Sequence, residues 1–246
     1  MKKIMMLCAL IGLTQMATAQ KSSYDPMARP NIVKLNLSGL AYKNIAVQYE
    51  RILGNKISVA CQLRFTPKGS MMFSKALDQV IDSDSVQSSD IKSGGFAITP
   101  EFRFYPRHAG KGFYLAPYLR YRNVNFDAPV SYLDDNGKTQ YVTSEGNFNS
   151  FIGGLMIGSQ FNLGKMVTLD WFILGLQYGS TKVDLKVKNT EPLSANDQAD
   201  IKSSVEDFTD YFGNLNTVVG PNGGSVTGTL AMLGFRGFGI NIGFKF

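Results

Sequence analysis

Charged residues at the polar positions of alternating apolar segments are the most specific chemical pattern in this sequence. Three are acids and three are bases: Lys34, Glu50, Glu101, Arg103, Asp170 and Lys245. Charges withdrawn from water must be paired, and paired charges fix the register of the segments that carry them. We therefore expect one internal charge network with a structural role. A proton or ion path is the alternative use of such a set.

A second group of charges is purely cationic. Arg64, Arg120 and Arg122 stand at polar positions with no acid from the same segments at their level. A guanidinium cannot shed its proton, so each needs an acid, a carbonyl or a bound anion. We expect the acidic loop of residues 184–213 to dock over this outer-mouth trio, with lipid phosphates as competitors and a solvated loop as the alternative. The acids concerned are Asp197, Asp200, Glu206, Asp207 and Asp210.

The sequence offers little support for an enzyme. A Ser/His hydrolase needs an imidazole beside its nucleophile, and the only histidine is His108, in the turn at 106–111. The sequence has no phosphate cradle between strand and helix, no zinc spacing and no regular calcium loop. Cys61 stands on an apolar strand face and is interpreted as a small hydrophobe. We predict neither catalysis nor a cofactor or metal.

The segments that position these residues alternate apolar and polar side chains with the period of a β-strand. The clearest is 94–105, where Phe96, Ile98, Phe102 and Phe104 share one face. Pro100 and Pro117 each remove a ladder donor, so bulges or weak pairing are expected there. Eight strands are predicted, at 33–38, 45–50, 56–66, 94–105, 113–122, 147–163, 166–183 and 237–246.

The links between the strands alternate in length, as in bacterial barrels with short periplasmic turns, long outer loops and an even strand number. Short links at 54–55, 106–111 and 164–165 alternate with long ones at 67–93, 127–146 and 184–225. The first outer link, 39–42, is short. Within the long links we expect helices at 70–82 and 194–212, and a hairpin that turns at Asn136-Gly137.

The first residues resemble an export signal. Lys2 and Lys3 precede an apolar run at 4–13, and small residues at 17–19 precede a predicted cleavage before Gln20. The run is about half of the roughly 20 residues that a membrane helix needs, which disfavours an uncleaved anchor. We expect a cleaved signal peptide at 1–19 and one barrel domain at 20–246.

Alternation alone does not separate a membrane barrel from a soluble lipocalin-like barrel. The polar face mixes Gly, Ala, Ser and Thr with a few Arg, Glu and Tyr, which is the composition of a packed interior. Gly237, Gly239 and Gly243 leave room for side chains from facing strands. Aromatic residues toward the ends of the apolar face are typical of interfacial girdles: Phe65, Phe104, Phe113, Tyr121, Phe161 and Phe246.

The last strand carries an alternating pattern that looks like the signal by which outer-membrane barrels are recognised for insertion. Its members are Phe238, Ile240, Ile242, Phe244 and Phe246. The stretches at 47–51 and 99–105 further resemble a family of uncharacterised eight-stranded outer-membrane barrels of Bacteroides-type Gram-negative bacteria, small barrels like outer-membrane protein A. The resemblance covers most of the mature chain. It implies a fold and an outer-membrane location, and no activity.

The predicted fold is therefore all-β: an eight-stranded antiparallel transmembrane up-and-down β-barrel. The predicted function is structural or interactive, an outer-membrane anchor that displays extracellular loops over a plugged polar lumen. Its expected partners are outer-membrane lipid, the barrel assembly machinery through the C-terminal strand and an extracellular partner of the loops, with no nucleic acid. A narrow channel or small-ligand carrier is the first alternative, and a lipid-modifying enzyme is the second.

Overall fold

In the computed structural model the chain forms antiparallel β-structure with one short helix. The structure describes residues 25–70, 91–133, 139–189, 192–195, 198–199, 202–203 and 213–246. The elements are β1 (Asn31–Asn36), α2 (Leu37–Ala41), β2 (Ile45–Ile52), β3 (Ile57–Ser70), β4 (Lys92–Phe104), β5 (Gly112–Leu133), β6 (Thr139–Leu163), β7 (Val167–Asn189), β8 (Gly213–Gly220), β9 (Gly223–Arg236) and β10 (Gly239–Lys245).

Several predictions fall on residues outside these ranges. The expected signal peptide at 1–19, the hairpin turn at 136–137 and nearly all of the helix at 70–82 are among them. β5 and β6 do pair up to Leu133 and Thr139, as a hairpin over 127–146 requires. Of the helix expected at 194–212, the described residues 195, 198–199 and 202–203 are helical.

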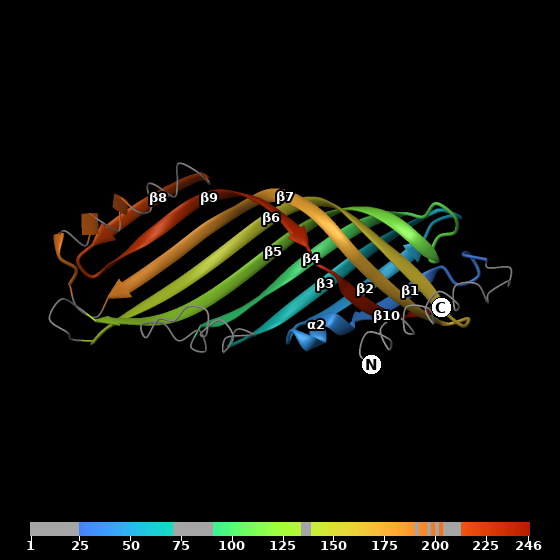
Figure 1. Ribbon diagram of the computed structural model, residues 1–246, viewed down its shortest axis with the longest axis horizontal. Coiled ribbons are helices and arrows are strands. Elements are labelled where there is room, and N and C mark those ends of the chain that lie inside the picture. Colours follow the sequence, from blue (N-terminus) through green and yellow to red (C-terminus); the bar gives the residue numbers. More distant parts are fainter. Residues whose placement is uncertain are drawn as a thin grey trace, which may run out of the picture.

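The ten strands form one antiparallel sheet that closes into a ring through eight of them. Strands β1 to β7 pair in chain order, and β10 pairs with both β7 and β1. β9 pairs with the far part of β7, and β8 pairs with β9. Figure 1 shows the closed ring at the end that holds the C-terminus, with the β8–β9 hairpin at the opposite end.

The β8–β9 hairpin corrects the prediction of eight strands and of a loop over 184–225. β7 continues to Asn189, and Pro221 and Asn222 form the turn between β8 and β9. Asparagine, glycine and threonine dominate this stretch, so its alternation is weak in the sequence. The two faces of β8 nevertheless alternate in exposure along the strand. The sheet therefore has ten strands, although eight still form the ring.

The first strand begins and ends two residues earlier than predicted. Leu37 begins α2 instead of extending the strand, and the side-chain oxygen of Asn36 accepts a hydrogen bond from the Gly39 amide. Such a cap satisfies an amide that the first helical turn leaves without a partner. Lys43, with a φ of 53°, then turns the chain toward β2.

Pro100 and Pro117 weaken one ladder without shifting its register. β4 and β5 keep the same register at Ile98–Tyr121, Glu101–Tyr118 and Phe104–Leu115, and the positions between these pairs are unpaired. The prediction of bulges or weak pairing is confirmed in its second form, since the ladder is weak at the prolines and its register does not shift. Register shifts lie instead between residues 66 and 69 of β3 and between residues 157 and 158 of β6.

The two ends of the ring differ, and we name them for their connections. The turns at 53–56, 105–111 and 164–166 gather with the C-terminus at the turn end, where backbone bonds of 2.7 Å join Tyr105 to Lys56 and Lys245 to Met166. At the other end, the loop end, β5, β6 and β7 run on beyond the ring (Figure 1). The turn end thus has three short connections, and at the loop end the connection from β1 to β2 through α2 is also short.

The outside of the ring is largely apolar, whereas its interior mixes polar and charged side chains with a smaller set of apolar ones. Arg103 and Glu50 are fully buried, whereas Leu63 and Phe113 are 59% and 63% exposed. Many large apolar side chains are therefore exposed, although side chains of this kind are among the most often buried in globular proteins. No helix within the described residues is long and apolar enough to cross a membrane.

Candidate functional site

An ion-pair network fills the ring interior toward its turn end. Arg103 on β4 contacts the carboxylates of Asp170, Glu101 and Glu50 at 2.8, 2.7 and 3.3 Å. Lys34 on β1 lies 2.5 Å from both Glu50 and Asp170. These five residues come from β1, β2, β4 and β7, so the network ties together strands from opposite sides of the ring.

Neutral side chains complete the network by donating hydrogen bonds to its carboxylates. Tyr105 and Ser58 donate to Glu50 at 2.9 and 2.5 Å, and Tyr114 donates to Asp170 at 2.8 Å. The guanidinium carbon of Arg103 also lies 4.5 Å from the centre of the Tyr114 ring. Buried charges are tolerable when they are paired and hydrogen-bonded, and both conditions hold here.

The sixth residue of the predicted network, Lys245, lies apart from the other five. Its ammonium group donates to the Asn162 side chain at 2.7 Å and to the Gly110 carbonyl at 3.4 Å, beside the turn end. The structure therefore brings five of the six predicted residues into one cluster and places the sixth closer to the turn end.

Arg236 belongs to the network although the sequence analysis did not single it out. Its guanidinium lies 2.9 Å from Glu101 and donates to Gln62 at 3.2 Å. Strict alternation back from Phe238 places Arg236 on the outer face. The break at residues 237–238, between β9 and β10, shifts the phase, so that Arg236 is 5% exposed while Phe235 and Phe238 point outward. Gly234 and Gly237 are the sequence feature that could have indicated this break, because glycine within a strand often marks an irregularity.

The outer-mouth trio lies farther toward the loop end, inside the ring. Arg64 on β3 and Arg122 on β5 both pair in register with Ala97 of β4. Arg120 donates to the Thr99 hydroxyl at 3.1 Å. Among the described residues, no acid forms an ion pair with any of the three. The predicted partners Asp197, Asp200, Glu206, Asp207 and Asp210 lie outside the described residues.

Glycines make room for the large polar side chains of the interior. A Cβ at Gly154 would lie 2.5 Å from the Tyr118 ring and from the Leu176 carbonyl oxygen, and one at Gly158 would overlap Tyr114. Gly239 and Gly243 similarly adjoin Phe172 and Lys34. Of the three C-terminal glycines expected to leave such room, Gly237 is the exception, because nothing lies near its Cβ position.

Replacing Gly154 with alanine is expected to lower the free energy of unfolding by about 1–3 kcal/mol, since the new methyl group must displace Tyr118 or the backbone of β7. The neighbouring Gly153 is the control. Its Cβ would make only an ordinary 3.7 Å contact with Leu119, and alanine there should raise stability by about 0.5 kcal/mol, because glycine weakens a strand. Denaturant unfolding followed by Trp171 fluorescence measures both; equal effects would contradict the packing argument.

The outer face turns from apolar to polar toward the loop end. Along β5, Leu119 and Tyr121 are followed on the same face by Asn123 and Asn125. On β6, Asn149 and Asn147 follow Phe151 in the same way. Hydrogen bonds link the four asparagines, including Asn123 to Asn149 at 2.8 Å. This asparagine cluster marks the edge of the apolar outer surface.

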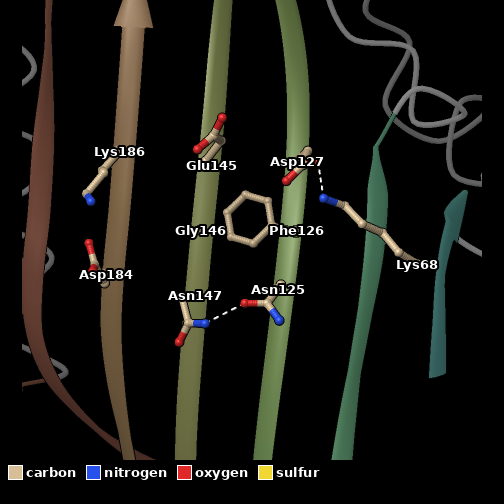
Figure 2. Close-up of a pocket in the computed structure, with 9 residues that line it drawn as sticks. All are labelled: Lys68, Asn125, Phe126, Asp127, Glu145, Gly146, Asn147, Asp184 and Lys186. Carbon is tan, nitrogen blue, oxygen red and sulfur yellow. Dashed lines mark hydrogen bonds and ion pairs between the residues drawn. The ribbon is translucent and has the colours of Figure 1, made fainter. Parts of the chain in front are cut away.

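Charged residues follow the asparagine cluster on the same face, around a hollow of about 280 Å³. Figure 2 shows the hollow over β5, β6 and β7, with Asp127, Glu145, Asp184 and Lys186 around it. Lys68 reaches across β4 to Asp127 at 2.5 Å. Acids and lysines mix here, and no group of potential metal ligands among the described residues is arranged to hold a metal ion.

The remaining chemically notable residues lie apart from these clusters. His108 sits in the turn at 105–111 and forms an isolated β-bridge with Lys111. Cys61 is a half-buried free cysteine on β3. The residues of the proposed assembly signal are all exposed, between 37% and 65%: Phe238, Ile240, Ile242, Phe244 and Phe246.

Comparison with known proteins identifies a family. A family model described as "Protein of unknown function (DUF3575)" matches residues 4–198. This range includes all the strands from β1 to β7 and excludes β8, β9 and β10. No curated protein and no solved structure matches the chain.

Proposed function

The chain belongs to this DUF3575 family, and we propose that it is an outer-membrane β-barrel whose filled interior serves as an anchor for the structure at its loop end. The proposal rests first on one observation: the closed ring of eight strands carries a largely apolar outer belt. Closure matters because only a ring leaves no strand edge unpaired in lipid.

The height of the belt supports insertion. The apolar outer residues span Phe96 to Phe104 on β4, Phe113 to Tyr121 on β5 and Phe151 to Phe161 on β6. Each run is about nine to eleven residues, the length that a tilted strand needs to cross a bilayer. The asparagine cluster and the charged hollow then lie beyond the belt, where side chains would meet water (Figure 2).

The aromatic residues support the same placement. Phe104 and Phe113 border the belt near the turn end, while Phe65 and Tyr121 border it near the loop end. Aromatic girdles at both interfaces are typical of outer-membrane barrels. In this orientation the turn end faces the periplasm, and the extensions of β5, β6 and β7 stand outside the cell.

The interior favours an anchor over a channel. Arg103, Tyr105, Tyr114 and Gln160 are each at most 2% exposed, and their hydrogen bonds cross the ring from side to side. An eight-stranded barrel is just narrow enough for its side chains to fill it. We therefore assign the function to the extensions of β5, β6 and β7 at the cell surface and to the loops.

Protein folded in detergent is expected to change its electrophoretic mobility on boiling, because a closed ring with paired backbone groups resists detergent until it is heated. The measurement compares boiled and unboiled halves of one sample, with urea-unfolded protein as the control for the denatured position. A chain that stays in solution without detergent and migrates identically in both halves would rule out the membrane barrel.

A further inference from the structure

The loop-end half of the ring interior collects four arginines with little to neutralise them. Arg64 and Arg122 flank Ala97 in register, and Arg120 and Arg236 lie against the same Tyr118 ring, at 5.5 and 5.2 Å from its centre. Arg64 lies close enough to Arg236 and Arg122 to be repelled by both. We call these four residues the arginine cluster.

Small side chains flank Arg64 and Arg122 on the neighbouring strands. Arg64 pairs with Ala46 on one side and with Ala97 on the other. Arg122 pairs with Ala97 on one side and with Ser150 on the other. Two arginines thus share one ring level with three small residues.

The acids of the described interior are already occupied by other cations. Glu101 lies nearest to the cluster, and one of its oxygens accepts from Arg236 while the other accepts from Arg103. Glu50 and Asp170 lie lower and bind Lys34 and Arg103. Within the part of the chain that the structure describes, no carboxylate remains for Arg64, Arg120 or Arg122.

Hydrogen-bond donors around the cluster also lack acceptors. The Nε atoms of Arg122 and Arg236 and the side-chain nitrogen of Gln62 are buried without a partner. Arg236 and Gln62 are only 5% and 1% exposed, so bulk water does not satisfy them. Three unpartnered donors near four permanent positive charges favour the binding of a group that accepts hydrogen bonds and carries negative charge.

We propose that the arginine cluster is a binding site for a phosphate group. A guanidinium matches phosphate with two parallel hydrogen bonds, and the several oxygens of phosphate suit donors that arrive from β3, β5 and β9 together. The phosphate would come from a small soluble ester that enters at the loop end or from a lipid headgroup of the outer leaflet. The site lies inside the ring, so the inference does not depend on insertion into a membrane.

The test measures the binding of inorganic phosphate to the full mature protein in neutral detergent at low ionic strength, by calorimetry and by the thermal unfolding midpoint. Phosphate should raise the wild-type midpoint. The Arg64→Gln/Arg122→Gln variant should bind at least about tenfold more weakly, since it loses two charge-assisted contacts. Lys182→Gln/Lys186→Gln removes the same charge from the exposed outer face of β7 and should change affinity less than about twofold.

The unfolding midpoint without phosphate shows whether the variants still fold. Loss of two mutually repelling charges should leave the phosphate-free midpoint unchanged or higher, and the milder Arg122→Gln replacement gives an intermediate loss of affinity. The proposal is overturned if phosphate affects wild type and Arg64→Gln/Arg122→Gln equally, which is also the result expected if carboxylates of the chain already neutralise the cluster. It is equally overturned if the Lys182→Gln/Lys186→Gln control loses as much affinity.

A second arm identifies the source of the phosphate. Wild-type protein is placed in phosphatidylcholine vesicles with and without lipopolysaccharide, and inorganic phosphate is added to each. A midpoint raised by lipopolysaccharide alone, and lost in Arg64→Gln/Arg122→Gln, assigns the site to a lipid headgroup. A midpoint raised only by added phosphate assigns it to a soluble ligand.

Discussion

Replacing Arg103 with methionine is expected to lower the free energy of unfolding by about 3–5 kcal/mol, as is typical when one partner of a buried ion pair is removed. Arg103 contacts Glu50, Glu101 and Asp170 in the closed interior, and methionine would leave the three carboxylates with Lys34 and Arg236 as their only contacting cations among the described residues. Denaturant unfolding followed by the fluorescence of Trp171, the single tryptophan, measures the loss.

Two further variants separate the network from the mere loss of an arginine. Arg51→Met removes an exposed arginine of β2, whose guanidinium binds the Asn31 side chain, and should cost less than about 1 kcal/mol. Asp170→Asn should cost less in the Arg103→Met background than in the wild type, because the two residues contact each other. Equal costs for Arg103→Met and Arg51→Met would contradict the network. Additive costs for Arg103→Met and Asp170→Asn would contradict it as well.

The burial of these charges could be predicted because it depends on local pattern. Side chains of a strand alternate between two faces, so an apolar face at Phe96, Ile98 and Phe102 fixes Glu101 and Arg103 on the other. Once eight such strands close a ring, the small residues of the polar face favour placing that face inward, because they leave room for the larger polar side chains. Pairing between Arg103 and Asp170, which are distant in the chain, then follows from the need of buried charges for partners.

The parts that were not predicted depend on breaks in that pattern. Arg236 moves inside because residues 237–238 interrupt the last strand, and no count of alternate residues reveals such a phase shift. The β8–β9 hairpin was missed because glycine and asparagine give its strands low β-propensity. Individual contacts, such as Tyr114 to Asp170 at 2.8 Å, depend on relative strand heights, which tilt and shear determine.

The second large effect concerns the outer belt. Replacing Leu155 with arginine is expected to lower the free energy of unfolding in lipid vesicles by about 2–4 kcal/mol, the cost of a basic side chain at the middle of a bilayer. Leu155 lies on β6 midway between Phe151 and Phe161, is 48% exposed and pairs with Pro117 and Leu176 on the neighbouring strands. Reversible denaturant unfolding from phosphatidylcholine vesicles measures the change.

Thr143 provides the matched control, because it is exposed on the same face of β6 beyond the asparagine cluster. Thr143→Arg introduces the same side chain outside the proposed bilayer, where surface substitutions usually change stability by at most about 0.5 kcal/mol. In water, Leu155→Arg would likewise be a surface substitution of small cost, since Leu155 is already exposed. A large loss of stability at residue 155 with none at residue 143 therefore requires lipid around the belt. Equal small losses would contradict membrane insertion and leave only the ring of strands.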